Sequence, residues 1–401
     1  MKSTSLVTGL FKALFNINYL KTVLQSENYR VLKRNLRSIG SGYIEFDEQK
    51  YKTFFEENSG KKVLLVSHEL SVTGAPNVLL NIAKHFKETN IAPFVITLKE
   101  GPMRKNFEAL EIPVLLFNIT NYNKSQLLPF VEKFDFAIAN TVMSYDFVKL
   151  FENVIPTVWW LHETNFHQTI FKRGYSFVTS ILNNAKNISV GTNYVKNDII
   201  QYNKNIKKLT YFIEEFDAYP KEKSDKINFS IIGSIDKRKA QDIFIEAIIA
   251  MPEEYRKKAI FNIVGRGDSF MEKLKDKAQG IDEIIWHGLI SSKEAYRQLL
   301  SNADVLVCVS RDDPDPVVVT EACMIGVPCI VTKSVGQSEY IKDGENGFVI
   351  DTENVEQLKN LMMKIIDNPQ MLENISKKTK SVYEENYTKA IFEKRLNEII
   401  S

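Results

Sequence analysis

Short apolar segments with strand character alternate with helical segments along most of the chain, and this alternation restricts the fold more than any other feature. Val63–Val66 is the first such segment. A polar loop follows it, and Pro76 then suits the first turn of a helix that carries Val78, Leu79 and Ile82. Unbroken apolar runs are typical of strands in parallel sheets, because helices cover both faces of such sheets. The alternation therefore predicts an α/β fold built on parallel sheets.

The alternation occurs twice, and a polar segment with Pro220, residues 214–226, separates the halves as the predicted linker. Expected strands lie at 63–66, 94–98, 114–117, 134–139, 157–161 and 188–191, then at 229–232, 259–264, 283–286, 305–309, 329–331 and 348–350. The sequence predicts a helical extension at 1–45, a doubly wound Rossmann-like domain at 46–213, a second one at 227–385, and a helix at 386–401 that returns to the first domain. Ligand is expected in the cleft between the domains, near the carboxyl ends of the strands.

The first 40 residues have a net charge of +6, from seven basic residues and Glu27, whereas the whole chain has +2. Leu6, Leu10, Phe11 and Leu14 form an apolar stripe at helical spacing. An amphipathic basic helix of this kind suits peripheral contact with a membrane surface. The alternative is that the stripe packs on the first domain or on a second subunit of an oligomer. The sequence leaves both open.

Composition excludes several other classes. A net charge of +2 gives no attraction toward nucleic acid. Cys308, Cys323 and Cys329 match no zinc or redox spacing and are expected to be reduced core thiols, as in a cytoplasmic protein. No apolar run reaches the roughly 18 residues that span a bilayer. We expect a cytoplasmic protein, with the inner face of the membrane as a second location.

Loops after the strands of the second half carry residues that suit phosphate. Gly233 opens a loop that contains Arg238 and Lys239 and leads into a helix, where cations and backbone N–H groups favour an anion. Gly265 lies in the next such turn and permits close backbone approach. The turn Gly336-Gln337-Ser338 follows a later strand and offers further N–H groups. Any one of these turns is common in α/β folds, so each alone is a weak indication.

Two carboxylates eight residues apart form the most specific pattern. Asp313 is expected in the loop after strand 305–309, and Glu321 within the helix that follows. Acidic residues are common near a helix N-terminus because they interact favourably with the helix dipole. The position of Asp313 therefore does not by itself require a function. Glu321 lies inside an apolar helix, where a carboxylate needs a partner.

The first half has two candidate positions at strand ends. Thr73-Gly74-Ala75 lies between the first strand and its helix, and His162 ends the strand 157–161. A lone histidine is more often structural than catalytic, and His68 in the first loop is a weaker candidate. Nothing in the sequence matches a metal-ligand cluster, a Ser-His-Asp triad or a Walker phosphate loop, so no metal or cofactor is expected.

Taken together and in order, these motifs resemble the retaining glycosyltransferases of family 4, which have the GT-B architecture. The resemblance covers about residues 62–400, and the stretch 312–321 looks like the variant found in enzymes that build bacterial surface polysaccharides. It implies a nucleotide diphosphate sugar, UDP- or GDP-linked, as donor and a glycan, lipid-linked glycan or protein as acceptor. It also implies retention of anomeric configuration, with front-side attack and the leaving phosphate taking the acceptor proton.

The resemblance also implies roles for the residues. Lys239, with Arg238 and N–H groups around Gly336, would hold the diphosphate, and Glu321 would hold the donor ribose. Asp313 would face the hydroxyls of the transferred sugar, and His162 would approach that sugar from the first domain. The remaining positions in the implied donor site are Gly74, Ala75, Gly233, Gly265, Gln337 and Ser338.

Three departures from the family pattern keep other functions open. Asp313 stands where the family usually has Glu, Asp315-Pro316 replaces the usual Phe-Gly, and Ser234 replaces the usual Arg. A catalytically silent GT-B subunit that stabilises another transferase is the main alternative. A third possible function is that of a nucleotide-sugar epimerase with the same fold. Donor hydrolysis separates the silent subunit from the enzyme, and an epimerase needs no acceptor.

Overall fold

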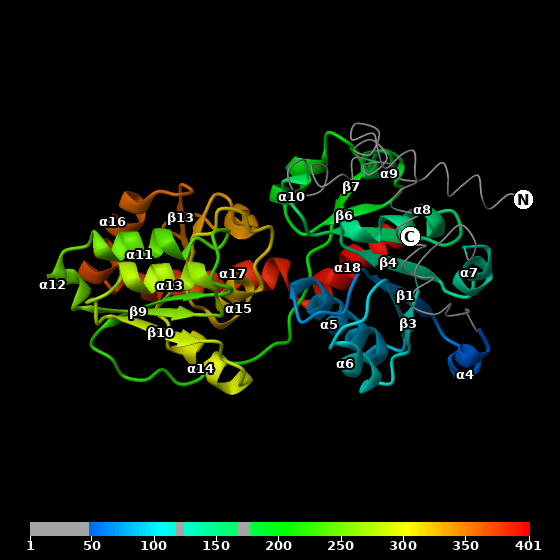
Figure 1. Ribbon diagram of the computed structural model, residues 1–401, viewed down its shortest axis with the longest axis horizontal. Coiled ribbons are helices and arrows are strands. Elements are labelled where there is room, and N and C mark those ends of the chain that lie inside the picture. Colours follow the sequence, from blue (N-terminus) through cyan, green and yellow to red (C-terminus); the bar gives the residue numbers. More distant parts are fainter. Residues whose placement is uncertain (1–47, 118–123, 167–176) are drawn as a thin grey trace, which may run out of the picture.

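The computed structural model describes residues 48–117, 124–166 and 177–401, and it contains two parallel sheets. The first sheet has seven strands in the order β3-β2-β1-β4-β5-β6-β7, and the second has six in the order β10-β9-β8-β11-β12-β13. Figure 1 shows the two domains side by side, each with helices around its sheet. The predicted GT-B fold class of two Rossmann-like domains is confirmed. The predicted helical extension, residues 1–45, lies outside the described residues.

The first domain follows the expected alternation. Its strands are β1 Lys62–Ser67, β2 Ala92–Thr97, β3 Val114–Leu116, β4 Phe136–Asn140, β5 Thr157–Leu161, β6 Ile188–Val190 and β7 Ile206–Lys208. Its helices are α4 Lys52–Glu57, α5 Gly74–Glu88, α6 Arg104–Glu108, α7 Lys124–Val131, α8 Tyr145–Phe151, α9 Val178–Asn184 and α10 Asn193–Ile199. Residues 63–67 of β1 are buried, as expected for a central strand with helices on both faces.

The second domain repeats the arrangement with six strands. They are β8 Ile227–Ile232, β9 Ala259–Val264, β10 Ile284–Gly288, β11 Val305–Cys308, β12 Cys329–Thr332 and β13 Phe348–Ile350. The helices are α11 Gln241–Ile249, α12 Glu253–Arg256, α13 Ser269–Lys277, α14 Lys293–Asn302, α15 Val317–Ile325, α16 Val355–Asp367, α17 Met371–Asn386 and α18 Lys389–Ile400. A short 3₁₀ helix, Gly336–Glu339, follows β12 and faces α10 of the first domain.

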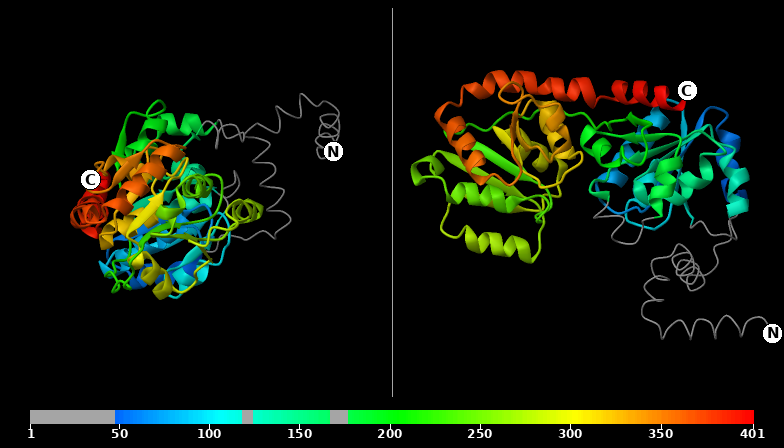
Figure 2. Two further views of the ribbon diagram at one scale, coloured as in Figure 1. Left: turned by 90° about the vertical axis from the view of Figure 1, so that its left-hand side faces the viewer. Right: turned by 90° about the horizontal axis from the view of Figure 1, so that it is seen from above.

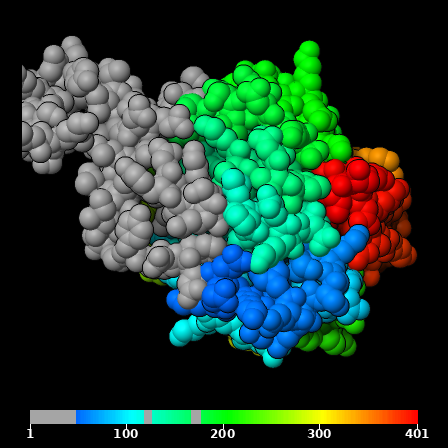
Figure 3. All heavy atoms as spheres, turned by 90° about the vertical axis from the view of Figure 1, so that its right-hand side faces the viewer, coloured from blue at the N-terminus to red at the C-terminus, as the bar shows by residue number. Residues whose placement is uncertain are grey.

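Within the described residues, the chain crosses between the domains twice. Residues 209–226, which form no helix or strand, lead from β7 to β8 (Figure 1). Helix α17 packs on α15, and α18 then packs on β5 of the first domain, so the two helices span both domains in the right-hand view of Figure 2. Figure 3 shows α18 in red on the surface of the first domain. Its Phe392 contacts the aromatic rings of Phe86, Trp160 and Phe212.

Strand β7 is absent from the sequence prediction, and the reason is physical. The strand has three residues, of which only Ile206 is buried, and Lys207 and Lys208 follow it. Within the described part of the chain it pairs with β6 alone, so it is an edge strand that lacks the apolar run of a central one.

None of the helices in the described part of the chain combines the length and the apolar character that crossing a membrane requires.

Candidate functional site

The carboxyl ends of the strands in both sheets carry the candidate residues. In the first domain His68 follows β1, Thr141 follows β4 and His162 follows β5. These strands are neighbours in the order β1-β4-β5, so the three residues lie at one sheet edge. In the second domain the loops after β8, β9, β11 and β12 share the corresponding edge. This is where an open parallel α/β sheet binds ligand.

Lys239 and Asp313 meet in the second domain although 74 residues separate them. The Nζ atom of Lys239 lies 2.5 Å from Oδ2 of Asp313, and Nη1 of Arg238 lies 3.2 Å from Oδ1. The Asp313 side chain is 8% exposed, so two cations neutralise a nearly buried carboxylate. Ser310 Oγ donates a further hydrogen bond, 3.3 Å long, to Oδ2. The structure thus brings together three residues that the sequence singled out.

Local contacts shape the loop that presents Lys239. Gly233 has φ +151°, a conformation that favours glycine, and a Cβ atom there would lie 3.6 Å from the Lys239 side chain. A Cβ atom at Gly265 would lie 1.8 Å from the carbonyl oxygen of Gly233, so the two turns pack backbone to backbone. Asp236 accepts hydrogen bonds from the Lys239 N–H and from the Ser234 hydroxyl, 2.9 and 2.6 Å long. The Ser234 hydroxyl is therefore already engaged within the loop.

Asp312, one residue before Asp313, connects the second domain to the first. Its carboxylate accepts hydrogen bonds from Thr164 Oγ1, Asn165 Nδ2 and Tyr194 Oη, at 2.6, 2.7 and 3.1 Å. Burial and the Asp312 charge raise the pKa of Tyr194 to about 12, so its hydroxyl stays a donor at neutral pH. Asp312 was not among the residues predicted from the sequence, because nothing in its own sequence surroundings shows that its partners are 118 to 148 residues away.

Asp315 belongs to the same contact between the two domains but lies in the interior of the protein. Its Oδ1 accepts hydrogen bonds from Gln337 Nε2 and Tyr387 Oη, at 2.7 and 2.8 Å. Among the described residues its buried Oδ2 has no hydrogen-bond partner. Burial raises the pKa of this carboxyl to about 8, so it is mainly protonated at neutral pH. A Cβ atom at Gly191 of the first domain would lie 2.4 Å from Oδ2, so the group is enclosed by both domains.

The predicted turn at Gly336, Gln337 and Ser338 lies beside the Asp313 loop. The Gly336 N–H donates to the Asp313 carbonyl oxygen at 2.9 Å, and the Ser338 N–H donates to Val335. The Gln337 side chain is buried, and its amide points to Asp315 and the start of α15 rather than into a pocket. The Gly336 N–H and the Gln337 amide thus hold the loop after β11.

Glu321 occupies a separate position on α15. Its Oε2 accepts a hydrogen bond from the Tyr296 hydroxyl of α14, which supplies the partner that the sequence analysis required. Burial raises the pKa of Glu321, while Tyr296, Arg297 and Lys293 lower it by smaller amounts. Within the described residues, no hydrogen bond or ion pair joins this side chain to Lys239, so the two belong to different parts of the site.

In the first domain Asn140 connects the two predicted positions. His162 Nε2 lies 2.7 Å from Asn140 Oδ1, and Asn140 Nδ2 donates to the Ala75 carbonyl oxygen at 2.9 Å. Gly74 and Ala75 are the first residues of α5, where Gly74 has open space around it. Burial lowers the pKa of His162 to about 4, so the imidazole is neutral at physiological pH. His68 lies nearby in the sheet order and hydrogen-bonds Thr141 Oγ1 at 2.9 Å.

Glu163 is a further ionisable residue that the sequence analysis did not select. Its carboxylate accepts the N–H groups of Val142 and His162, each at 3.1 Å. Burial raises the pKa of Glu163 to about 7, against the opposing effect of these hydrogen bonds. The two contacts fix the backbone at the end of β5, next to His162.

A pocket of about 330 Å³ lies between the loops after β9 and β10. Its walls include Gly265, Arg266, Trp286, His287 and Leu289. Leu289 is 66% exposed, and His287 Nε2 lies 2.8 Å from Asn262 Oδ1. The volume falls within the range of small-molecule sites. The pocket therefore combines an aromatic ring and apolar side chains with the basic Arg266 and Lys275, beside the predicted Gly265 turn.

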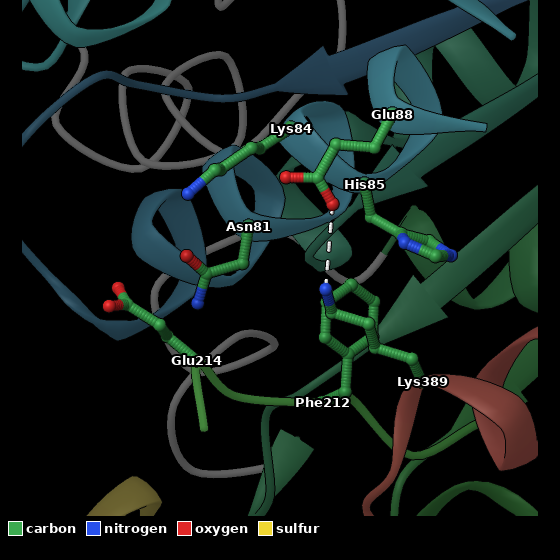
Figure 4. Close-up of a pocket in the computed structure, with 7 residues that line it drawn as sticks. All are labelled: Asn81, Lys84, His85, Glu88, Phe212, Glu214 and Lys389. Carbon is green, nitrogen blue, oxygen red and sulfur yellow. Dashed lines mark hydrogen bonds and ion pairs between the residues drawn. The ribbon is translucent and has the colours of Figure 1, made fainter. Parts of the chain in front are cut away.

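A much smaller pocket lies where α5, the linker and α18 meet, and Figure 4 shows its seven lining residues. The rings of Phe212 and His85 form part of its wall. The Nζ atom of Lys389 lies 3.5 Å from Oε2 of Glu88. The cavity measures about 40 Å³, which is room for water but not for a sugar. Glu214, also in its wall, pairs with Lys293 of the second domain at 2.6 Å. We assign this pocket no ligand.

Two family models match the chain. Residues 59–214 match the glycosyl-transferase family 4 model, and residues 212–382 match the model described as glycosyl transferases group 1. No curated protein matches the chain. Within the described residues, no group of three or more His, Cys, Asp or Glu side chains is arranged to hold a metal ion.

Solved structures share the fold at low sequence identity. HepE of Anabaena in complex with UDP-glucose has a TM-score of 0.70 at 18% identity, over 85% of this chain and 99% of that one. A TarM variant of S. aureus, in complex with Fondaparinux, alpha-GlcNAc-glycerol and UDP, has a TM-score of 0.67 at 14% identity, over 85% and 100%. A glycosyltransferase of Rickettsia africae has a TM-score of 0.67 at 15% identity, over 85% and 98%.

Proposed function

The chain belongs to glycosyltransferase family 4, with a group 1 glycosyl transferase domain in its second half, and on this basis we propose that it transfers a sugar from a nucleotide diphosphate sugar with retention of configuration. The observation that carries the proposal is the contact of Lys239 and Arg238 with the nearly buried Asp313. It places two cations and a carboxylate together at the carboxyl edge of the second sheet. A diphosphate leaving group needs such cations. The carboxylate can accept hydrogen bonds from the hydroxyl groups of a sugar.

In the proposed reaction, the bond between the sugar anomeric carbon and the β-phosphate oxygen breaks. The acceptor oxygen forms its bond to the same face of that carbon, and the acceptor proton passes to the departing phosphate oxygen. Lys239 and Arg238 stabilise the negative charge that develops on the diphosphate. When Lys239 binds phosphate, Asp313 becomes available to accept hydrogen bonds from sugar hydroxyls. His162 meets the sugar from the first domain.

The donor nucleotide is proposed to extend along the second domain. The pocket beside Gly265, with Trp286 and Leu289, suits a flat base, and Glu321 suits the ribose hydroxyls as an acceptor. HepE was solved with UDP-glucose and TarM with UDP, which favours a uridine nucleotide over a guanine nucleotide in this chain. A thermal-shift series with UDP, GDP and their sugars tests this. A ligand at 100 times its Kd stabilises the folded state by about 2.7 kcal/mol. No shift with any of them would contradict the proposal.

The acceptor is proposed to be a glycan, either free or lipid-linked. The structure of TarM contains alpha-GlcNAc-glycerol, and another similar structure, WaaG, is named as a glycosyltransferase of lipopolysaccharide biosynthesis. The first name includes a glycerol that carries GlcNAc, and the second refers to lipopolysaccharide, which is a polymer of the bacterial surface. A bacterial surface polysaccharide is therefore the first class of acceptor to assay, with radiolabelled donor and extracted polymer or lipid-linked glycan.

Glu321→Gln is expected to weaken binding of UDP itself by about tenfold. The substitution removes the charge that strengthens a hydrogen bond to a ribose hydroxyl, and such charge-assisted bonds are worth about 1.5–3 kcal/mol. Isothermal titration with UDP and with UDP-sugar measures both affinities. An effect seen only with the sugar-bearing donor would contradict the ribose assignment. Glu294→Gln, at an exposed position on the neighbouring α14, is the control and should leave the affinity unchanged.

Transfer is expected to persist in EDTA. Lys239 and Arg238 supply positive charge where a divalent ion would otherwise neutralise the diphosphate. The measurement is the initial rate with and without chelator, after dialysis of the protein. A complete loss of rate that added Mn²⁺ restores would show that a metal takes part.

A further inference from the structure

Asn140 is a polar residue at the end of an apolar strand and has no role in the proposed reaction. It is the last residue of β4, in the sequence Phe-Ala-Ile-Ala-Asn, and it is fully buried. A buried amide must satisfy both its donor and its acceptor groups. Here the donor bonds to the Ala75 carbonyl oxygen and the acceptor lies against His162 Nε2, at 2.9 and 2.7 Å.

These two contacts determine the protonation of the imidazole. Nδ2 can only donate, so its contact with the Ala75 carbonyl orients the amide and turns Oδ1 toward His162. Oδ1 can only accept, so Nε2 must carry a proton. The low pKa of His162 keeps the ring neutral, which leaves Nδ1 unprotonated. Nδ1 has no hydrogen-bond partner in the described part of the chain.

The same amide ties His162 to the start of α5. Strand β4 lies between β1, whose following loop leads to Gly74 and Ala75 at the start of α5, and β5, which ends one residue before His162. Asn140 pairs with Trp160 in the β4–β5 register, and the Trp160 ring packs against the His162 ring with centroids 4.7 Å apart. The imidazole is therefore held on one side by an aromatic ring and at Nε2 by a buried amide. A rigid ring with one bare nitrogen suits a hydrogen-bond acceptor.

We propose that Asn140 is a positioning residue for sugar transfer, which fixes His162 as the Nε2–H tautomer and presents its Nδ1 as an acceptor for a hydroxyl of the donor sugar. The proposal rests on the glycosyltransferase function and on the role of His162 given above. It adds a residue that orients the imidazole and links it to the Gly74–Ala75 turn. Asn140 itself touches no substrate.

The tautomer is tested without any assay of activity. Long-range ¹H–¹⁵N correlation spectra of imidazole nitrogens distinguish the two neutral forms, and the chain has five histidines, so His162 is assigned by comparison with His162→Ala. We expect a protonated Nε2 and an unprotonated Nδ1 in the wild type, and mixed tautomers in Asn140→Ala. A protonated Nδ1 in the wild type would overturn the proposal, whether or not the enzyme transfers sugar.

The pH profile of turnover provides the second test. The titratable groups on neighbouring strand ends are Glu163 after β5 and His68 after β1, and neither contributes to the lowered pKa of His162. Asn140→Asp places a carboxylate against Nε2, which raises the pKa of the imidazole and protonates Nδ1 at higher pH. We expect kcat of this variant to fall on the acid side at a pH at least one unit higher than in the wild type. UDP affinity should stay within about twofold.

Three further variants complete the design. Asn140→Ala should lower kcat about tenfold with little change in UDP affinity. Asn203→Ala removes another amide of the first domain that donates to two carbonyl groups, at Leu182 and Ala185, and should leave kcat unchanged. In the double variant Asn140→Asp with His162→Ala, the shift to higher pH of the acid-side fall in kcat should disappear. Persistence of that shift, or an unshifted profile in a folded Asn140→Asp protein, would overturn the proposal.

Failure of the glycosyltransferase function would look different. In that case the wild type itself would neither transfer nor hydrolyse any nucleotide sugar, and no pH profile would exist to compare. Because the spectroscopic test needs no substrate, the tautomer would still be measured. The two failures are therefore distinguishable.

Discussion

Replacing Lys239 by Ala is expected to lower kcat/KM at least about 10²-fold, because the substitution removes a charged contact to the leaving diphosphate. The interaction strengthens as negative charge develops on the phosphate oxygens, so most of the loss should appear in kcat. The measurement is initial-rate kinetics with the donor that the thermal-shift series identifies. An unchanged kcat/KM would remove Lys239 from the site.

Two controls separate lost catalysis from lost stability in the Lys239 experiment. Lys237 lies in the same loop with an exposed side chain, so Lys237→Ala should change kcat/KM by less than about twofold. Removing Lys239 also leaves the nearly buried Asp313 with Arg238 as its one remaining cation within 4 Å among the described residues. Lys239→Ala should therefore lower the Tm as well, and Lys239→Ala with Asp313→Asn should restore the Tm without restoring turnover.

Replacing His162 by Ala is expected to lower kcat about 10²-fold while the affinity for UDP stays within about twofold. The loss is that of a preorganised hydrogen-bonding group at the reacting sugar. Nucleotide affinity should persist because His162 belongs to the first domain, whereas the proposed nucleotide pocket lies between the loops after β9 and β10 of the second. Steady-state rates and isothermal titration with UDP measure the two quantities.

The opposite result for His162 has a clear meaning. If the variant loses UDP binding, His162 is structural or the nucleotide lies elsewhere. His68→Ala is the matched comparison, because His68 follows β1 at the same sheet edge, two strands away from β5, and its Nδ1 bonds to Thr141. Its effect on kcat should be smaller than about tenfold. An equal effect of both histidines would point to a general disturbance of the sheet edge.

The fold was predictable from sequence because its central strands are buried on both faces. Val63–Val66 reads as one apolar run for that reason, and the linker stands out because it is polar and contains Pro220. Strand β7 was missed because an edge strand needs no apolar run, and its three residues include two lysines. Helix α17 was missed as a separate element because its mixed polar pattern, Met371–Asn386, gives a weak helical signal beside the stronger one of α16.

The site was predictable only in part, for a different physical reason. Parallel strands end at one edge, so loops such as those of Lys239 and Asp313 were expected to meet, and they do. Contacts between the domains depend on how two separately folded units dock, and no local sequence pattern predicts that docking. Asp312 with its three partners in the first domain is such a case. Asn140 did carry a local signal, since a lone amide closes an otherwise apolar strand.

The return of α18 to the first domain gives the protein an unusual order of completion during synthesis. The last strand of the first sheet, β7, ends at Lys208, whereas α18 begins at Lys389, about 180 residues later. At roughly 5–20 residues per second, a ribosome needs on the order of 10 to 40 s to cover that distance. Throughout this interval the nascent first domain lacks Phe392, which packs on the rings of Phe86, Trp160 and Phe212. Its aromatic surface is then open to chaperones, and a premature stop codon in the last helix would impair the domain that was made first.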